Sequence, residues 1–231
     1  MIVYHIRKSK GFKLSARESP IVIRNLSDRI FDIVRDQIVV GKLPVDQPIR
    51  QDSLAADLGV SKIPLREALG RLEHDGLLVS HPNRGFFVRP MSTEEAEEIF
   101  ALRLAIEPEA MAAAARIATE ADHDVARQAL ATLDDAASQH LEEVAARNRD
   151  FHMALILPAR QSLTAQLVER LQTLGERYVH KHLEPAGRED RAHLEHQGLL
   201  DAWIARDIKR AKSLCSAHIQ GTLEDLRSQI A

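Results

Sequence analysis

Three histidines and one asparagine have the residue types and spacing of a transition-metal site. Asn148 and His152 stand four residues apart in the stretch RNRDFHMAL, so they share one face of any helix formed there. His196 and His218 belong to two other stretches of helical pattern. Imidazole nitrogens with an oxygen donor suit zinc, nickel or another divalent transition ion. The sequence therefore predicts a metal site at which three helices converge.

The alternative is that these histidines are unrelated, because scattered histidines are common and the chain has 11 of them. His193 competes with His196, since a spacing of three residues puts both on one helix face. His193 and the remaining histidines of this half are more simply interpreted as surface residues; the others are His123, His140, His180 and His182.

A metal held by histidines also allows a second class of function, a metal-dependent hydrolase or lyase. Such an enzyme needs an open coordination position and a positioned general base. The sequence singles out no base, and it contains no Ser-His-Asp order, no glycine-rich phosphate loop and no CxxC pattern. A ligand-binding role is therefore favoured over catalysis.

The elements that must position these residues are helices. From residue 92 onward glycines are few and apolar residues recur three and four apart. Breaks at 119–121, Pro158, 185–187 and Asp207 predict helices at 92–118, 121–136, 138–157, 162–183, 187–206 and 207–230. Such a bundle can hold a ligand between facing helices. The single cysteine, Cys215, excludes an intrachain disulfide and is interpreted as a buried, inert thiol.

The first ninety residues have a different pattern. An apolar stripe from Leu26 to Ile38 predicts a first helix, a short helical segment ends at Gly59, and Leu65, Leu69 and Leu72 mark a third helix. The stretch LLVSHPNRGFFVRP then predicts a β-hairpin around its Pro-Asn-Arg-Gly turn. Three helices followed by a hairpin describe a winged helix-turn-helix.

The charges of the two halves differ in sign. Residues 1–90 contain 15 Lys and Arg against 10 Asp and Glu, whereas the rest contain 16 against 24. Lys62 and Arg66 stand at the start of the third helix, where a helix-turn-helix meets the major groove, and Arg84 stands at the tip of the wing. Ser61 is a suitable N-cap and Pro64 is tolerated in the first turn. The basic half is therefore expected to bind DNA.

The combination LGVSKIPLREALGRLEHDGL with PNRGFFV resembles the DNA-binding domain of the GntR family of bacterial transcription regulators. The resemblance implies that the third helix reads a palindromic operator and that the wing enters the minor groove. The residues that it implies for DNA contact are Ser61, Lys62, Pro64, Arg66, Arg71, Arg84 and Gly85. Lys62 stands where many relatives have arginine, and lysine lacks the bidentate fork for guanine. Asp52 occupies a position that is arginine in some members, and no DNA contact is expected there.

The segments STEEAEEIFALRLAIEPEAMAAAAR, RNRDFHMAL and LEHQGLLDAW resemble the helical effector-binding domain, called FCD, of the FadR branch of that family. Many FCD domains bind a divalent metal through an aspartate and three histidines. The resemblance assigns these roles to Asn148, His152, His196 and His218, with asparagine in place of the aspartate. A site without that charge favours an anionic ligand such as a carboxylate.

The same resemblance places Arg103 in the effector pocket, where its planar guanidinium could bind a carboxylate through two hydrogen bonds. The alternative is an ion pair between Arg103 and Glu107, one helical turn further on, and the two roles are compatible.

Together these features predict a mainly α protein in three parts: a flexible arm (1–20), a winged helix-turn-helix (21–91) and an all-helical FCD bundle of six or seven helices for effector binding and dimerisation (92–231). The predicted function is a ligand-responsive transcription regulator, in the manner of a repressor. Its expected partners are operator DNA, a small organic acid, a divalent metal and a second copy of the chain. The sequence lacks a signal peptide and a long apolar run, so a cytoplasmic location without membrane attachment is expected.

Overall fold

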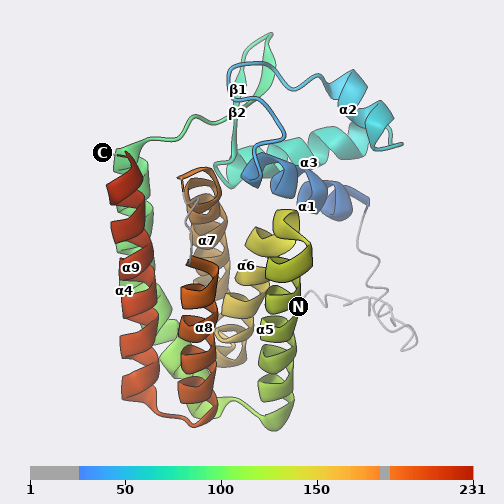
Figure 1. The fold of residues 1–231 in the computed structure, drawn as a ribbon. Coiled ribbons are helices and arrows are strands. Elements are labelled where there is room, and N and C mark those ends of the chain that lie inside the picture. The colour runs from blue at the N-terminus through green and yellow to red at the C-terminus, as the bar shows by residue number, and fades with distance from the viewer. Residues whose placement is uncertain (1–25, 183–187, 231) are drawn as a thin grey trace, which may run out of the picture.

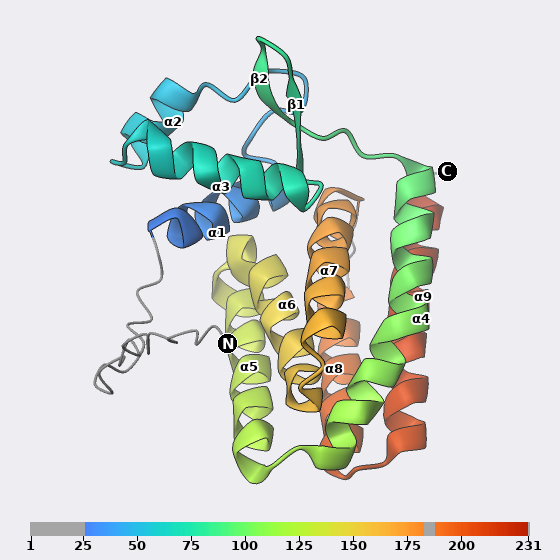
Figure 2. The same cartoon turned by 180° about the vertical axis from the view of Figure 1, so that it is seen from behind.

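A computed structural model describes residues 26–182 and 188–230, which form two parts stacked end to end (Figures 1 and 2). The smaller part contains α1 (Leu26–Val39), α2 (Gln51–Asp57), α3 (Lys62–His74), β1 (Leu78–His81) and β2 (Gly85–Val88). The larger part contains α4 (Thr93–Ile117), α5 (Glu120–Gln139), α6 (Val144–Ala154), α7 (Ser162–His182), α8 (Arg188–Ile204) and α9 (Ile208–Ile230). The predicted mainly α fold with a winged helix-turn-helix and a helical bundle is confirmed.

The smaller part is held together by apolar faces of α1 and α3. Ile30, Val34 and Ile38 of α1 are buried against Leu65 and Leu69 of α3, as the helical spacing predicts. The wing is an antiparallel pair in which Leu78 faces Val88 and His81 faces Gly85. Its turn contains two residues of positive φ, Asn83 at 60° and Gly85 at 83°, so glycine suits the end of the turn.

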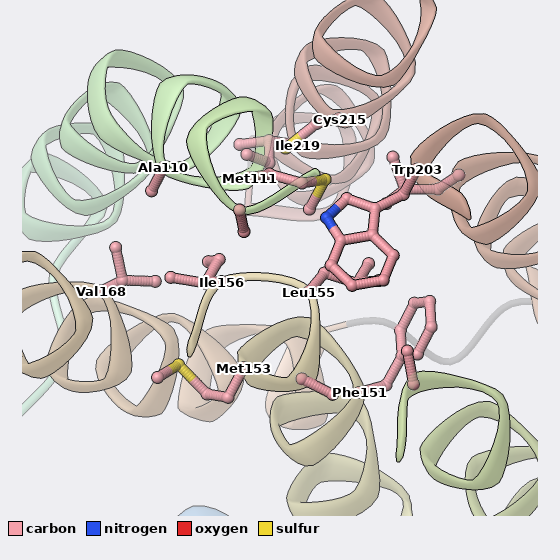
Figure 3. Close-up of a cluster of buried hydrophobic side chains, with 14 of the residues drawn as sticks. Ala110, Met111, Phe151, Met153, Leu155, Ile156, Val168, Trp203, Cys215 and Ile219 are labelled. Carbon is pink, nitrogen blue, oxygen red and sulfur yellow. The ribbon is translucent and has the colours of Figure 1, made fainter. Parts of the chain in front are cut away.

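The bundle is organised around α4, which packs along α9 and α7. Helix α4 starts at Ser92, whose side chain accepts a hydrogen bond from the Glu95 backbone. Helix α5 starts at a capping box formed by Thr119 and Asp122. The core between the helices includes Met111, Phe151, Leu155, Trp203 and Cys215 (Figure 3). Cys215 is buried, as predicted, and burial raises the pKa of its thiol.

Two details of the predicted bundle are corrected. The helix predicted at 138–157 is divided: a 3-10 turn covers Leu141–Glu143, α6 ends at Ala154, and a second 3-10 turn covers Leu157–Ala159. Pro158 lies within that second turn, which fits proline's lack of a donor for a longer helix. His123 is not a surface residue, because its ring packs against Trp203 at 5.4 Å between centroids and is only 7% exposed.

The remaining helix ends agree with the prediction within a few residues. The predicted arm at 1–20 and the predicted break at 185–187 lie outside the described residues. Over the described parts of the chain, every helix is too short or too polar to span a membrane.

Candidate metal and effector site, and the DNA-binding surface

Three imidazoles from three helices meet inside the bundle. His152 of α6, His196 of α8 and His218 of α9 have ring centroids 4.8 to 5.3 Å apart. One possible ligand atom from each residue lies within 4.8 Å of the others. This spacing allows three nitrogens to bind one ion after small side-chain adjustments, because zinc–nitrogen bonds are about 2.0–2.1 Å long. The structure thus brings together the three histidines that the sequence singled out.

His152 fits a metal ligand better than a core histidine. It is 1% exposed, and neither of its ring nitrogens has a hydrogen-bond partner within residues 26–182 and 188–230. Burial, and then the neighbouring His218 and His196, hold the pKa of His152 well below its usual value. The ring is therefore neutral at physiological pH, and a nitrogen lone pair is available for an ion. Asn148, the predicted oxygen donor, stands one turn earlier on α6 and is half-buried.

A carboxylate that the sequence analysis did not single out contacts the histidine cluster from outside. Glu195 Oε2 lies 2.7 Å from His218 Nδ1. Glu195 directly precedes His196 on α8, so the two side chains point in different directions around the helix axis. Only the packing of α8 against α9 brings it to His218. The signal in the sequence was a charged residue beside a candidate ligand, which is too common to be informative.

Arg103 is buried and forms the ion pair that the sequence offered as the alternative. Its Nε donates to Glu107 Oε1 at 2.6 Å, and Gln172 of α7 donates to the other oxygen of Glu107 at 3.2 Å. The guanidinium also stacks on Phe100, 5.1 Å from the ring centroid. Gly175 of α7 lies close by, since a Cβ at this position would be 3.2 Å from Arg103 Nη1. Arg103 therefore has a fixed position near His152, whose pKa it lowers through its charge.

A second buried ion pair, also missed from sequence, joins the bundle to the winged helix. Arg149, next to Asn148, donates to Glu176 of α7 at 2.5 Å. The same guanidinium lies 3.5 Å from Asp36 of α1. Burial raises the pKa of Glu176 to about 7, although the charges of Arg149 and Arg103 act in the opposite direction. Nothing in the sequence relates these residues, because they come from three separate helices.

Helix α7 contacts both parts of the protein through different faces. Arg170, Leu174 and Arg177 form one face: Arg170 donates to the Asp75 carbonyl, Leu174 packs against the winged-helix core, and Arg177 donates to the Arg89 carbonyl. At about 100° per residue, Gln172, Gly175 and Glu176 point to the opposite side, toward Arg103 and Arg149. Helix α7 thus contacts the buried polar residues on one side and the winged helix-turn-helix on the other, in addition to the direct contact between Arg149 and Asp36.

The exposed face of the recognition helix α3 contains both basic and apolar side chains. Ser61 occupies the predicted N-cap position in extended conformation, but its side chain forms no capping hydrogen bond within the described residues. Pro64 lies in the first turn, as predicted, and Arg66 is exposed. The Lys62 ammonium forms an ion pair with Asp52 of α2. Ile63 is 81% exposed on the side of this helix opposite its apolar stripe, where its spacing puts it, and it was not among the residues predicted to contact DNA.

The other basic residues predicted to contact DNA have different surroundings. Arg71 does not project freely from α3: it donates to Asp28 of α1 at 2.5 Å and lies 4.6 Å from the centroid of Phe31. Arg84 is exposed at the wing tip, where its guanidinium stacks on Phe87 at 5.2 Å, and Gly85 follows in the turn. Both side chains are exposed, but Arg84 lies at the wing tip, whereas Arg71 contacts Asp28 and Phe31 of α1.

This architecture, a winged helix-turn-helix attached to a helical bundle with a buried polar cluster, defines the class of DNA-binding proteins that sense a small ligand. Residues 26–88 match the family model described as bacterial regulatory proteins, gntR family, and residues 98–221 match the FCD domain. The chain belongs to the GntR family of transcription regulators, in the group with an FCD domain.

Relatives and solved structures agree with this membership. A protein of Paraburkholderia xenovorans (strain LB400) named uncharacterized HTH-type transcriptional regulator BphR is 31% identical, with 94% of this chain and 93% of that protein covered. The HTH-type transcriptional repressor GlaR of Escherichia coli (strain K12) is 30% identical, with 80% and 89% covered. The E. coli McbR/YncC structure has the same fold with a TM-score of 0.77 at 24% identity, covering 90% of this chain and 99% of that chain. The comparisons give no support to the hydrolase or lyase alternative.

Proposed function

We propose that this regulator binds a palindromic operator as a homodimer and changes its affinity for DNA when a small carboxylate binds in the bundle. The observation that supports this most directly is the buried cluster of His152, His196 and His218 near Arg103. A relative is named as a repressor, and we extend that mode of action to this chain. Palindromic operators mirror two-fold protein symmetry, so we also propose that the bundle (residues 92–231) dimerises. The proposed location is the cytoplasm.

For operator contact we propose the start of α3 and the tip of the wing within residues 21–91. Lys62 and Arg66 supply donors for base edges or phosphates in the major groove, Ser61 and Pro64 approach the backbone, and exposed Ile63 suits a thymine methyl group. Arg84 and Gly85 would act in the minor groove. Arg71 is proposed to support the helix from behind through Asp28, so its effect on DNA binding would be indirect.

For the bundle we propose a divalent transition ion, zinc or nickel, held by His152, His196, His218 and Asn148. Such an ion would supply a positive centre for an exogenous carboxylate, because imidazole and amide ligands bring no negative charge. Arg103 would bind the same carboxylate while Glu107 holds its guanidinium in place. This donor set fits a small organic acid as the effector.

The route to DNA in this proposal is α7. An anion beside Arg103 changes the charge facing Gln172, Gly175 and Glu176, and the opposite face of the same helix holds Asp75, Arg89 and the winged-helix core. A shift of α7 would then move α3 and the wing with respect to the bundle. In a dimer this alters the separation of the two recognition helices, and a ligand with different affinity for the two arrangements shifts their populations.

Metal analysis of the purified, untagged protein tests the central element of this proposal. Inductively coupled plasma mass spectrometry should find about one transition ion per chain after incubation with zinc or nickel. His196→Ala should lose this ion. His193→Ala is the matched control, since His193 is an exposed histidine three residues away on the same helix and pairs with Asp134. A protein that binds no ion, or a His196→Ala variant that keeps it, would overturn the assignment of the ligands.

A further inference from the structure

We propose that Glu195 is a positioning residue of the metal site and that it provides the negative charge that Asn148 does not. This inference rests on the proposed metal site. It concerns a residue outside the four predicted ligands, and it starts from one contact: Glu195 Oε2 lies 2.7 Å from His218 Nδ1.

The contact determines which nitrogen of His218 can bind an ion. A carboxylate accepts hydrogen bonds, so it holds the ring proton on Nδ1 and leaves the lone pair on Nε2. His218 is only 11% exposed at its side chain, which limits competition from water for the same proton. The ring is thereby fixed in one tautomer and one orientation before any ion arrives. Hydrogen-bonded carboxylates behind metal-binding histidines commonly strengthen binding in this way.

The second part of the argument is charge. His152, His196 and His218 are neutral as ligands, and an amide oxygen from Asn148 adds no charge. Glu195 is the carboxylate that the structure places against one of these rings. Its negative charge is transmitted through the Nδ1–H bond, because a proton shared with a carboxylate makes the opposite nitrogen a stronger donor to a cation. Glu195 thus supplies the negative charge that the ligands lack, and it acts through His218 without binding the ion itself.

Glu195 is itself held in this position from the other side. Arg191, one helical turn earlier on α8, lies 3.6 Å from Glu195 Oε1, and Arg191 also forms an ion pair with Asp225 of α9. The two oxygens of Glu195 therefore face different partners, Arg191 and His218. The pair with Arg191 lies within α8, whereas the contact with His218 joins α8 to α9.

The test separates hydrogen bonding from charge. Glu195→Gln keeps an acceptor oxygen but loses the charge, and Glu195→Ala loses both. Asp201→Asn is the matched control: it removes one carboxylate from the same helix, where Asp201 is exposed and bonded to Gln197. Zinc and cobalt(II) affinities are measured by competition with a chelator. The tautomer of His218 is read in the metal-free proteins from long-range nitrogen–proton NMR correlations.

We expect about tenfold weaker zinc binding in Glu195→Gln and a larger loss in Glu195→Ala, with little change in Asp201→Asn. The Nδ1–H tautomer should dominate in the wild type and be lost in Glu195→Ala. Adding Asn148→Asp to Glu195→Gln should restore most of the affinity, because it returns the charge within the ligand set. Unfolding temperatures of the metal-free variants that match the wild type exclude a general loss of structure.

Two failures are distinguishable. If the wild type binds neither zinc nor cobalt(II), the proposed metal site is wrong and this inference falls with it. If the wild type binds the ions but Glu195→Gln and Glu195→Ala bind equally well, the metal site stands and the role of Glu195 is refuted. A His218 ring that carries its proton on Nε2 in the metal-free wild type would also refute it.

Discussion

Gly175 of α7 lies against the guanidinium of Arg103 so closely that a Cβ would be 3.2 Å from Arg103 Nη1. This close contact links Arg103 of α4, the proposed effector-binding residue, to α7, the helix that contacts the winged helix. The guanidinium is also held by Glu107 and Phe100, so it has little freedom to move away from a larger residue.

Gly175→Ala should therefore weaken carboxylate binding. A methyl group must displace Arg103 by a few tenths of an ångström, while the gain in helix propensity is about 1 kcal/mol. We expect an effector affinity several-fold lower with an unfolding free energy within about 1 kcal/mol of the wild type. Calorimetric titration with a carboxylate that raises the wild-type unfolding temperature measures the affinity. Gly221→Ala on α9, where a Cβ has open space, is the control, and equal losses in both variants would contradict the prediction.

Arg149→Met should uncouple the bundle from DNA binding. It removes the charge shared by Glu176 and Asp36 but keeps most of the side-chain volume. Operator affinity with and without the carboxylate, measured by fluorescence anisotropy on DNA selected from random sequences, should then differ less than in the wild type. Coupling energies of this kind are typically about 1–3 kcal/mol. Arg147→Met changes a half-buried neighbour that is paired with Glu143, and it should retain the full difference.

The stability of the protein should show the titration of Glu176. In the unfolded chain this carboxyl has an ordinary pKa near 4.5, whereas burial raises the pKa in the folded protein to about 7. Between these values the folded state holds more protons, so this contribution to stability is complete below pH 4.5 and is lost as pH rises through 7.

In Glu176→Gln the side chain at this position cannot titrate, so its unfolding free energy should not show this decrease with rising pH. From pH 5 to pH 8 the wild type should therefore lose on the order of 2 to 3 kcal/mol of unfolding free energy relative to the variant. Urea unfolding of both proteins at the two pH values provides the comparison. Parallel pH profiles would mean that Arg149 keeps Glu176 ionised throughout this range.

Arg66 and Arg71 should behave differently although both are arginines of α3. Arg66→Ala should weaken operator binding and reduce the slope of log affinity against log salt by about one, because it removes an exposed cation at the proposed DNA surface. Its metal content should stay unchanged. Arg71→Ala should mainly lower the unfolding free energy, since its guanidinium contacts Asp28 and Phe31. An unchanged salt slope in Arg66→Ala would contradict this division.

Periodicity and residue type were sufficient to predict the wing and all helices but the divided one at 138–157, whereas the choice of His152, His196 and His218 among the histidines also needed the family resemblance. They were insufficient wherever the contact depends on how two helices face each other. Arg149 and Glu176 have no sequence relationship, and Glu195 reaches His218 only because α8 packs on α9. His123 was misplaced because a histidine in a polar stretch gives no sign that a tryptophan from α8 covers it. Such contacts depend on tertiary packing, which a single sequence leaves unspecified.

The connection between the wing and α4 is bound by α7: Arg177 donates to the Arg89 carbonyl, and the Tyr178 hydroxyl accepts from the Ser92 backbone and donates to Glu95. The segment between the two domains is therefore fixed to α7 by hydrogen bonds. In the proposed dimer, the bundle would then set the distance between the two operator half-sites that the protein recognises, although it lies outside the proposed DNA-binding surface. A change in that bundle alone could retune which spacing of half-sites is accepted, with α3 and the wing left as they are.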